Sequence, residues 1–362
     1  GNDLHIANLM SGFVTNPMEH AESSLLAIYS VASYAWNPEE YDSMKAWRDA
    51  MKEILPSAAK ELEIFATHNS DLGPNGHGYR REESVALKPI AERFLNEYLN
   101  KGTYPMEDLL ALLDTFTLMQ EAADILMTTT ENPALISEMK PWLVQHKLMG
   151  ETGQEVFTML EAYNVENQEL FLRKYKHVKA LQQQMFNIDQ TYNQNPYQPG
   201  VKTAGLVIKP LIDQTFAKVV EMYNNKYGTA LDGKTDYIPH TLTSDVNQLK
   251  NLPLRQKTNR ILVSPANEVI KWQGKGFMSI ELDKVYPLMT IDIDFGKPEV
   301  AAWGTLEIST NGKDWQKVDF QQNKNRIRLN GEKTPVKAIR FTNTQDKEQE
   351  IYMRNFTITV EK

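Results

Sequence analysis

The sequence predicts a multidomain α + β protein in which a bundle of helices precedes a β-sandwich. Three observations lead to this fold class. The chain has 362 residues, which corresponds to two or three domains at the usual size of about 100–200 residues each. Apolar residues recur every three or four positions up to about residue 227, as on one face of a helix. From about residue 250 they alternate instead, as in strands.

The helical part is predicted from four long amphipathic segments. They cover about residues 109–126, 136–163, 171–188 and 208–227. Helix breakers separate them, namely Gly102 with Pro105, the pair Asn132-Pro133, and the proline-containing stretch 193–200. Because the connections are short, we expect neighbouring helices to pack antiparallel. We therefore assign residues 81–234 to a helical bundle domain.

Short strands are predicted in the last third of the chain. Hydrophobicity alternates over residues 290–295, 306–309, 326–329, 338–341 and 356–360. Several short strands at close spacing are typical of a β-sandwich, which we assign to residues 259–362. Residues 235–258 are rich in Lys, Asp, Asn and Thr and are interrupted by Pro239 and Pro253, so we predict a linker there.

Residues 1–80 fit neither part. A helix is predicted from Glu19 to Ala35, and apolar residues lie on nearly all of its sides. A helix of this kind needs burial against something larger than one neighbour. The helix therefore requires a larger packing partner than its predicted neighbours in this chain.

Charge and composition exclude several classes of protein. From Arg255 onward there are 18 Lys and Arg against 14 Asp and Glu, and before it 21 against 33, which gives net charges of +4 and −12. An acidic front half argues against a nucleic-acid partner. The absence of cysteine excludes thiolate catalysis and zinc–thiolate sites. No apolar run approaches the roughly 20 residues of a membrane span.

Asn16 is the first candidate functional residue. It follows a short strand-like stretch, residues 12–15, and precedes Pro17 and Glu19. Asn is a preferred helix cap, Pro a preferred first helical residue, and an acid at the third position completes a capping pattern. The alternative is that Asn16 ends a barrel strand and faces a ligand, because such strand ends carry function in α/β barrels. Both roles are compatible, because the amide oxygen can cap the helix while the NH₂ group donates outward.

Paired carboxylates are the groups that glycoside hydrolysis needs. Glu39-Glu40 and Glu82-Glu83 are adjacent pairs, but polar neighbours favour exposed helix starts for both. Asp292 and Asp294 share one face of a predicted strand, which we interpret as a solvated face. No catalytic carboxylate is assigned in this chain.

The histidines give no clear metal site. His68, Asp71 and His77 lie in a stretch rich in Gly, Pro and Asn, which favours a turn-rich loop over metal ligation. His20 and His177 are single histidines on predicted helices, where packing or surface exposure is the ordinary role. We therefore predict no metal and no cofactor.

An exposed aromatic ring in the β-sandwich would offer a platform for a sugar. Trp272, Trp303 and Trp315 are the candidates. Trp315 follows a turn and is expected in the core. Trp272 precedes Gly274-Lys275-Gly276 and is therefore predicted to be the exposed, carbohydrate-binding tryptophan, although large aromatic residues belong more often to a core.

Longer motifs resemble a known family. Residues 11–22 (SGFVTNPMEHAE), 32–38 (ASYAWNP) and 68–84 (HNSDLGPNGHGYRREES) are similar to bacterial glycoside hydrolase family 84, the O-GlcNAcase-like β-N-acetylglucosaminidases of Bacteroides-type bacteria. The stretches FLRKY at 171–175 and NQNPYQPGVK at 193–202 agree with it. The resemblance covers essentially the whole chain. It implies that residues 1–80 are the terminal segment of a catalytic (β/α)₈ barrel, followed by a helical domain and a β domain similar to discoidin-like carbohydrate-binding modules.

The resemblance also implies a division of chemistry. In that family two adjacent barrel aspartates assist attack by the 2-acetamido group of the substrate, and configuration is retained; this differs from the usual enzyme nucleophile. Neither aspartate of that pair is found in this chain. Of the family's sugar-contacting residues, the Asn of the Asn-Pro motif maps onto Asn16, which implies a hydrogen bond to a GlcNAc hydroxyl.

Together these observations predict an accessory region of a β-N-acetylglucosaminidase acting on terminal β-linked GlcNAc, inactive when isolated. The alternative is a non-catalytic carbohydrate-binding or protein-interaction module, with a homodimer formed through the long helices. The expected partners are GlcNAc-containing glycans or glycoproteins, with no nucleic acid and no membrane span. The resemblance alone implies a periplasmic, cell-surface or secreted location in a Bacteroides-type bacterium.

Overall fold

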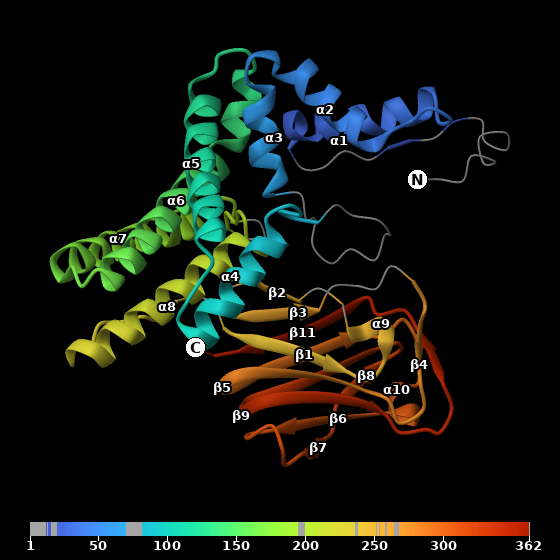
Figure 1. The fold of residues 1–362 in the computed structure, drawn as a ribbon. Helices are drawn as coiled ribbons and strands as arrows, with labels where there is room; N and C mark the ends of the chain where they lie inside the picture. Colours follow the sequence, from blue (N-terminus) through green and yellow to red (C-terminus); the bar gives the residue numbers. More distant parts are fainter. Residues whose placement is uncertain are drawn as a thin grey trace. The chain divides into compact units, whose positions relative to one another are not determined.

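The computed structural model forms two compact units (Figure 1). One unit comprises residues 1–70 and 83–207, and the other comprises residues 71–82 and 208–362. The structure describes residues 12, 14–15, 20–69, 82–194, 200–235, 238–250, 252, 254–257, 259–263 and 268–361. The description below follows each unit by itself.

The first unit is helical throughout its described residues. Its elements are α1 (Ala21–Trp36), α2 (Ser43–Ile54), the 3₁₀ turn η2 (Pro56–Ala58), α3 (Ala59–Thr67), α4 (Lys88–Lys101), α5 (Met106–Thr128), α6 (Pro133–Asn164) and α7 (Gln168–Thr191). The helices predicted at 109–126, 136–163 and 171–188 are confirmed as α5, α6 and α7. In this unit α5 packs on α6 and α6 packs on α7.

The residues predicted as helix breakers form the caps at which these helices end or begin. Gly102 adopts φ +70° and ends α4, a conformation that costs glycine little. The Asn132 side chain accepts a hydrogen bond from the Leu135 N–H at 3.0 Å, with Pro133 as the first residue of α6. Asn167 caps α7 in the same way.

Two glycines let α5 and α6 approach closely. A Cβ added at Gly150 would lie 2.6 Å from the Phe116 carbonyl oxygen, and one at Gly153 would lie 2.7 Å from the Phe116 ring. The approach seats Phe116 against Phe157 with ring centroids 5.3 Å apart, and Phe157 stacks on Phe94 at 5.0 Å. All three phenylalanines are fully buried, and they form the centre of the helical core.

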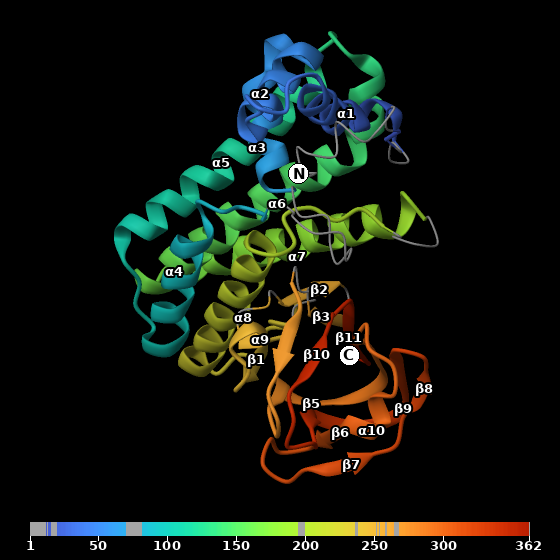
Figure 2. The same ribbon diagram turned by 90° about the vertical axis from the view of Figure 1, so that its right-hand side faces the viewer.

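Helix α1 does not receive the burial that its sequence predicts. Ser24 is its one buried residue, while Leu25 is 37% and Trp36 91% exposed. The helix lies on α2 and α6, and Figure 2 shows it beside α2. The Glu138 carboxylate accepts hydrogen bonds from the Glu22 and Ser23 N–H groups at 3.2 and 3.0 Å, which satisfies donors at the start of α1. Within this chain, α1 therefore keeps much of its apolar surface uncovered.

The second unit begins with α8 (Ile208–Tyr227), the fourth predicted long helix. Its strands are β1 (His240–Ser244), β2 (Leu254–Lys257), β3 (Arg260–Val263), β4 (Ile270–Trp272), β5 (Phe277–Asp294), β6 (Gly304–Ser309), β7 (Gln316–Val318), β8 (Gln321–Asn323), β9 (Arg326–Asn343), β10 (Gln349–Ile351) and β11 (Asn355–Val360). Short helices α9 (Asn247–Lys250) and α10 (Val300–Trp303) interrupt them. Residues 235–258, predicted as a linker, thus contain β1, α9 and β2.

All the described strand pairs are antiparallel. The main sheet has the order β2-β3-β11-β5-β9-β6-β7, with β1 joined to β5 and β8 to β9, and β10 pairs with β4 in a small second sheet. Figure 1 shows the order from β5 through β9 and β6 to β7. The pair β5–β9 runs from Phe277 opposite Thr342 to Asp294 opposite Arg326, with register shifts near residues 281–290. The five predicted short strands are confirmed within β5, β6, β9 and β11.

The close approach of α5 and α6 gives a first prediction. We expect Gly150→Ala to lower the free energy of unfolding by about 1–2 kcal/mol, because the new methyl meets a backbone oxygen that cannot move independently, and this outweighs the helix propensity gained. Urea unfolding followed by helical circular dichroism measures it. Gly205→Ala is the matched control, because no atom lies within 4 Å of a Cβ there. Equal stability of both variants would contradict the packing argument.

Candidate functional site

Trp272, predicted to be exposed, is fully buried. Its indole N–H donates to the Gly276 carbonyl at 2.8 Å, and the rings of Phe295, Trp303 and Phe341 surround it with centroids 6.1, 6.1 and 5.7 Å away. A tryptophan packed in this way has no face left for a sugar. The prediction that Trp272 is an exposed platform is therefore wrong.

The glycine turn after Trp272 is the reason why this tryptophan is buried. A Cβ at Gly274 would lie 2.4 Å from the Asp346 carbonyl oxygen, so the turn rests directly on the segment that follows β9. The Lys275 N–H donates to the Gln345 carbonyl at 3.0 Å. The two glycines thus close the turn over the tryptophan and bury it.

Trp315, predicted in the core, is half-buried on the outer face of the sheet. The Arg340 guanidinium lies over its ring, 4.1 Å from the centroid. Glu307 accepts two hydrogen bonds from Arg340, at 2.8 and 3.0 Å, across the β6–β9 register. Arg340 of β9 thus binds both the Trp315 ring and the Glu307 carboxylate of β6, and this contact links β6 to β9 on the outer face of the sheet.

Tyr352 is the exposed aromatic residue that the sequence reasoning missed. It follows β10, is 53% exposed, and lies between the buried residues Ile351 and Met353. Its N–H donates to the Phe295 carbonyl at 2.9 Å. This bond fixes the backbone that carries the ring.

Gly296 allows the loop after β5 to lie directly against residues 352–354, which follow β10. It adopts φ +61°, and a Cβ there would lie 2.7 Å from the Tyr352 Cβ and 3.4 Å from the Arg354 Nε. The Arg354 N–H donates to the Asp294 carbonyl at 2.9 Å, and the Arg354 side chain is exposed. An aromatic ring and a guanidinium therefore flank one glycine.

A third loop joins the same end of the unit. The Phe295 N–H donates to the Asn325 carbonyl at 3.0 Å, and the Asn325 side-chain amide donates to the Asp294 carboxylate at 2.8 Å. We name residues 294–299, 324–326 and 352–354 the three-loop end. Its backbone is held by hydrogen bonds, and it presents an aromatic ring with polar groups around it. That combination can stack on a sugar ring and hydrogen-bond its substituents.

The helical unit contains a second polar feature, a buried histidine pair. His68 follows α3, and its Nδ1 lies 2.8 Å from the Ser84 Oγ. His146 is on α6, and its Nδ1 lies 3.1 Å from the Thr203 Oγ1. The two imidazole rings are 5.9 Å apart, and the Phe65 ring packs edge-on against His146 at 5.1 Å. The pair thus joins α3 and α6 to residues 84 and 203.

Burial keeps both imidazoles neutral. It lowers the pKa of His68 to about 4 and that of His146 to about 3, and the second histidine adds to the fall at His146. Neither imidazole pairs with a carboxylate among the described residues. The pair therefore lacks the acid–base partner that a catalytic dyad needs and acts in packing.

Glu83 was predicted at an exposed helix start, and that prediction is wrong. The carboxylate is buried and accepts hydrogen bonds from the Leu206 and Val207 N–H groups, both at 3.0 Å. Burial raises its pKa to about 7, although these backbone donors act in the opposite direction. Its hydrogen bonds anchor the start of the 83–88 segment on the turn at residues 205–207. Glu39 and Glu40, by contrast, are exposed as expected.

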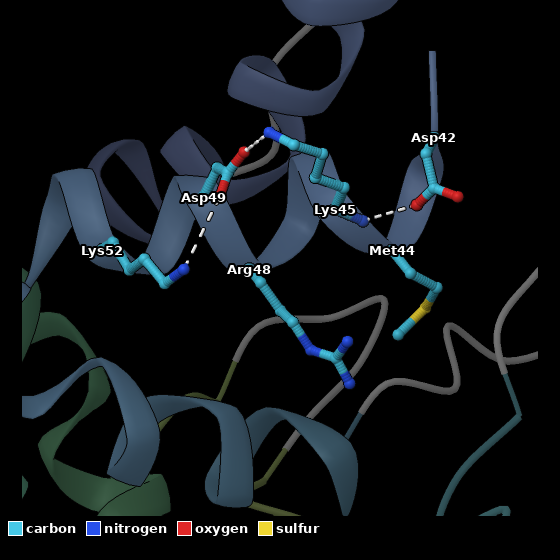
Figure 3. A pocket seen from close by; sticks show the side chains of 6 residues that line it. All are labelled: Asp42, Met44, Lys45, Arg48, Asp49 and Lys52. Atoms are coloured by element: carbon cyan, nitrogen blue, oxygen red, sulfur yellow. Dashed lines mark hydrogen bonds and ion pairs between the residues drawn. The ribbon is translucent and has the colours of Figure 1, made fainter. Parts of the chain in front are cut away.

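A surface hollow of about 580 Å³ lies along α2 (Figure 3). It is lined by Asp42, Met44, Lys45, Arg48, Asp49 and Lys52. Lys45 pairs with Asp49 at 2.5 Å, the Asp42 carboxylate accepts the Lys45 N–H at 2.6 Å, and Arg48 pairs with Glu63 outside the hollow at 2.9 Å. Since all six residues come from one helix and its cap, the hollow has no opposing wall. We assign it no ligand.

Several predicted residues give no further site. Asn16, Asp71 and His77 lie outside the described residues. His20 packs edge-on against Trp142 at 5.5 Å, and His177 lies 3.4 Å from Glu155.

Among the described residues, no three His, Asp or Glu side chains are arranged to hold a metal ion. Among these residues there is also no helix with the length and apolar character to cross a bilayer.

Three family models match the chain in order. Residues 1–67 match the β-N-acetylglucosaminidase model. Residues 83–216 match the model described as bacterial GH84, post-catalytic domain, and residues 231–294 match carbohydrate binding module family 32. The three matches follow the helices of the first unit and the first strands of the second.

Two solved structures are also similar to parts of the chain. A structure titled CpGH84D is 27% identical with a TM-score of 0.50, and the match covers 57% of this chain and 34% of that chain. An O-GlcNAc hydrolase mutant of Thermobaculum terrenum is 19% identical with a TM-score of 0.45, and the match covers 60% of this chain and 43% of that one. The chain therefore spans less than half the length of these proteins.

The buried histidines give a pH prediction. The unfolded chain takes up protons below pH 6.5, whereas the folded imidazoles do so near pH 4 and 3, so the unfolded state binds more protons between these values. As the pH is lowered through this range, the free energy of unfolding should decrease by about 1.4 kcal/mol for each pH unit, and each of the two histidines contributes this amount. Glu83 acts oppositely, because its raised pKa adds stability below pH 7 that is complete below pH 4.5.

The measurement is urea unfolding, followed by helical circular dichroism, from pH 7 to pH 4.5. We expect the parent to lose stability as the pH falls, and His68→Gln with His146→Gln to reverse the sign of this dependence, because of these three groups Glu83 alone then remains. His177→Gln is the control, because His177 is 46% exposed on α7. An unchanged slope in the double variant would rule out the buried pair as its source.

Proposed function

We propose that this chain, which carries in order the end of the catalytic domain, the post-catalytic helical domain and the family 32 module of a bacterial GH84 β-N-acetylglucosaminidase, supports catalysis and binds glycans without supplying the catalytic carboxylates. The observation that carries this proposal is the order of the three family models along the chain. The parent enzyme would hydrolyse terminal β-linked GlcNAc with retention, using the substrate's acetamido group.

The exposure of α1 supports this division. The helix belongs to the region that matches the β-N-acetylglucosaminidase model, and most of its surface is not buried by the rest of this chain. Apolar side chains left in water, such as Trp36 at 91% exposure, gain about 25 cal/mol per Å² when covered. We propose that the remainder of a catalytic domain covers them.

The three-loop end supports the binding role. Family 32 modules are carbohydrate-binding by description, and the second unit presents Tyr352 on a backbone held by three loops. A ring on a rigid loop loses little conformational entropy on binding. We propose that Tyr352 stacks on a sugar ring, in place of the buried Trp272.

Catalysis is tested by hydrolysis of an aryl β-GlcNAc glycoside. We expect no turnover above background from this chain, because no carboxylate pair is assigned to the reaction in it. The full-length parent is the positive control in the same assay. Substantial hydrolysis by the chain alone would refute the proposed division.

Glycan binding is tested by calorimetric titration with oligosaccharides that end in β-linked GlcNAc. We expect Tyr352→Ala to weaken binding about ten- to hundredfold, since an aromatic anchor contributes roughly 1.5–3 kcal/mol. The matched control is Tyr192→Ala, because Tyr192 is 50% exposed on the other unit. Equal affinity of both variants would remove Tyr352 from the site.

Asn16 is tested in the full-length parent. We expect Asn16→Ala to lower turnover about ten- to hundredfold, which corresponds to a lost polar contact of about 1.5–3 kcal/mol. Steady-state kinetics and thermal unfolding are measured together. Unchanged kinetics with lowered stability would assign Asn16 to helix capping instead.

A further inference from the structure

We propose that the three-loop end prefers a glycan with an anionic substituent, a carboxylate or a sulfate, on the sugar next to the one stacked on Tyr352. The inference rests on the proposed carbohydrate-binding function and names the chemical class of its ligand. It depends on the charges that surround Tyr352.

One cation beside Tyr352 is Arg354. Its Nε lies 3.4 Å from the position of a Cβ at Gly296, the same glycine against which the Tyr352 Cβ packs. Arg354 is exposed and forms no ion pair with another described residue. Its guanidinium is therefore available beside the ring. A planar guanidinium can bind a carboxylate or a sulfate through two parallel hydrogen bonds.

Further cations lie on the neighbouring strand. Arg326 and Arg328 pair in register with Asp294 and Asp292 of β5, and both are exposed while Ile327 between them is buried. Their side chains therefore project from the outer face of the sheet. Lys324, also exposed, precedes them in the loop to β9. Together with Lys297 and Arg354, five cations occupy this end of the unit.

The carboxylates nearby are largely used within the protein. Asp292 accepts two hydrogen bonds from Arg326, at 2.6 and 2.7 Å. Asp294 accepts the Gly296 N–H and the Asn325 amide, both at 2.8 Å. Glu299 is exposed, and so is Glu350, which precedes Tyr352 by two residues and lies opposite the exposed Lys271 of β4. With Lys271, six cations stand against four acids at this end of the unit and leave it a net positive charge; Arg326 is paired with Asp292, whereas Lys324, Arg328 and Arg354 form no ion pair with another described residue.

This surface attracts anions through solvent, so its effect should depend on salt. At an ionic strength of 0.1 M, exposed charges act over about 10 Å, and at 1 M over about 3 Å. A neutral sugar gains nothing from these cations beyond hydrogen bonding. Ionic strength therefore separates the charge contribution from stacking on Tyr352.

The test is calorimetric titration of the full chain with three tetrasaccharides. The first alternates GlcNAc with glucuronate, the second is its carboxyl-reduced, neutral analogue, and the third carries sulfate in place of the carboxylate. At 50 mM salt we expect both anionic probes to bind about tenfold more tightly than the neutral probe. At 0.5 M salt this advantage should disappear. A difference between the carboxylate and sulfate probes identifies the favoured group.

Variants connect the preference to residues. Arg354→Gln should remove most of the anionic advantage, and Arg328→Gln should reduce it. Lys313→Gln is the matched control, since Lys313 is an exposed cation in the turn after β6. Thermal unfolding of each variant verifies that the fold is retained.

The outcomes separate the two proposals. Equal affinity for neutral and anionic probes, or an anionic advantage that persists in Arg354→Gln and Arg328→Gln, would overturn the inference and leave glycan binding intact. Equal binding of a single-stranded DNA oligonucleotide would also overturn it, because the surface would then recognise charge alone. Failure of all three tetrasaccharides to bind would overturn the proposed glycan binding itself.

Discussion

The pairing of β5 with β9 is the interaction on which the second unit depends. Each strand has 18 residues, and both ends of their ladder meet the same aromatic cluster, since Phe295 after β5 packs on Phe341 of β9 with ring centroids 4.5 Å apart. At one end they hold Met278 opposite Phe341, beside the buried Trp272. At the other end they place Asp294 opposite Arg326, where the three loops meet. The position of the three loops thus depends on the register of the β5–β9 ladder. This register is fixed, because a shift by one residue would expose the buried face of both strands.

Periodicity predicted most of the fold. The helices α5 to α8 and the strands within β5, β6, β9 and β11 follow from apolar spacing, because burial of one face decides both patterns. The segment 235–258 was misread because β1 and β2 have few apolar residues and depend on pairing with β5 and β3. Strand pairing is a long-range interaction, and local composition carries little information about it.

The candidate site was much less predictable. The exposure of an aromatic residue depends on which distant segment covers it. The local sequence therefore predicts neither the burial of Trp272 nor the exposure of Tyr352. The available signal for Tyr352 was its position between Ile351 and Met353, which alternate toward the core. The prediction that Glu83 is exposed is wrong for a related reason. The backbone N–H groups that bind its carboxylate belong to residues 206 and 207, more than 120 residues away in the sequence. Sequence neighbours therefore said nothing about its surroundings.

Gly296 has a consequence for how the proposed binding surface can change over evolution. The gap between the Tyr352 and Arg354 side chains is set by two stretches of backbone in contact at a residue without a side chain. Mutations elsewhere in the loops can alter what the ring and the guanidinium recognise while their separation is preserved. A mutation at Gly296 would instead displace both groups at once. Ligand preference can therefore diverge between homologues through the residues around this glycine, while the spacing that defines the site is inherited unchanged.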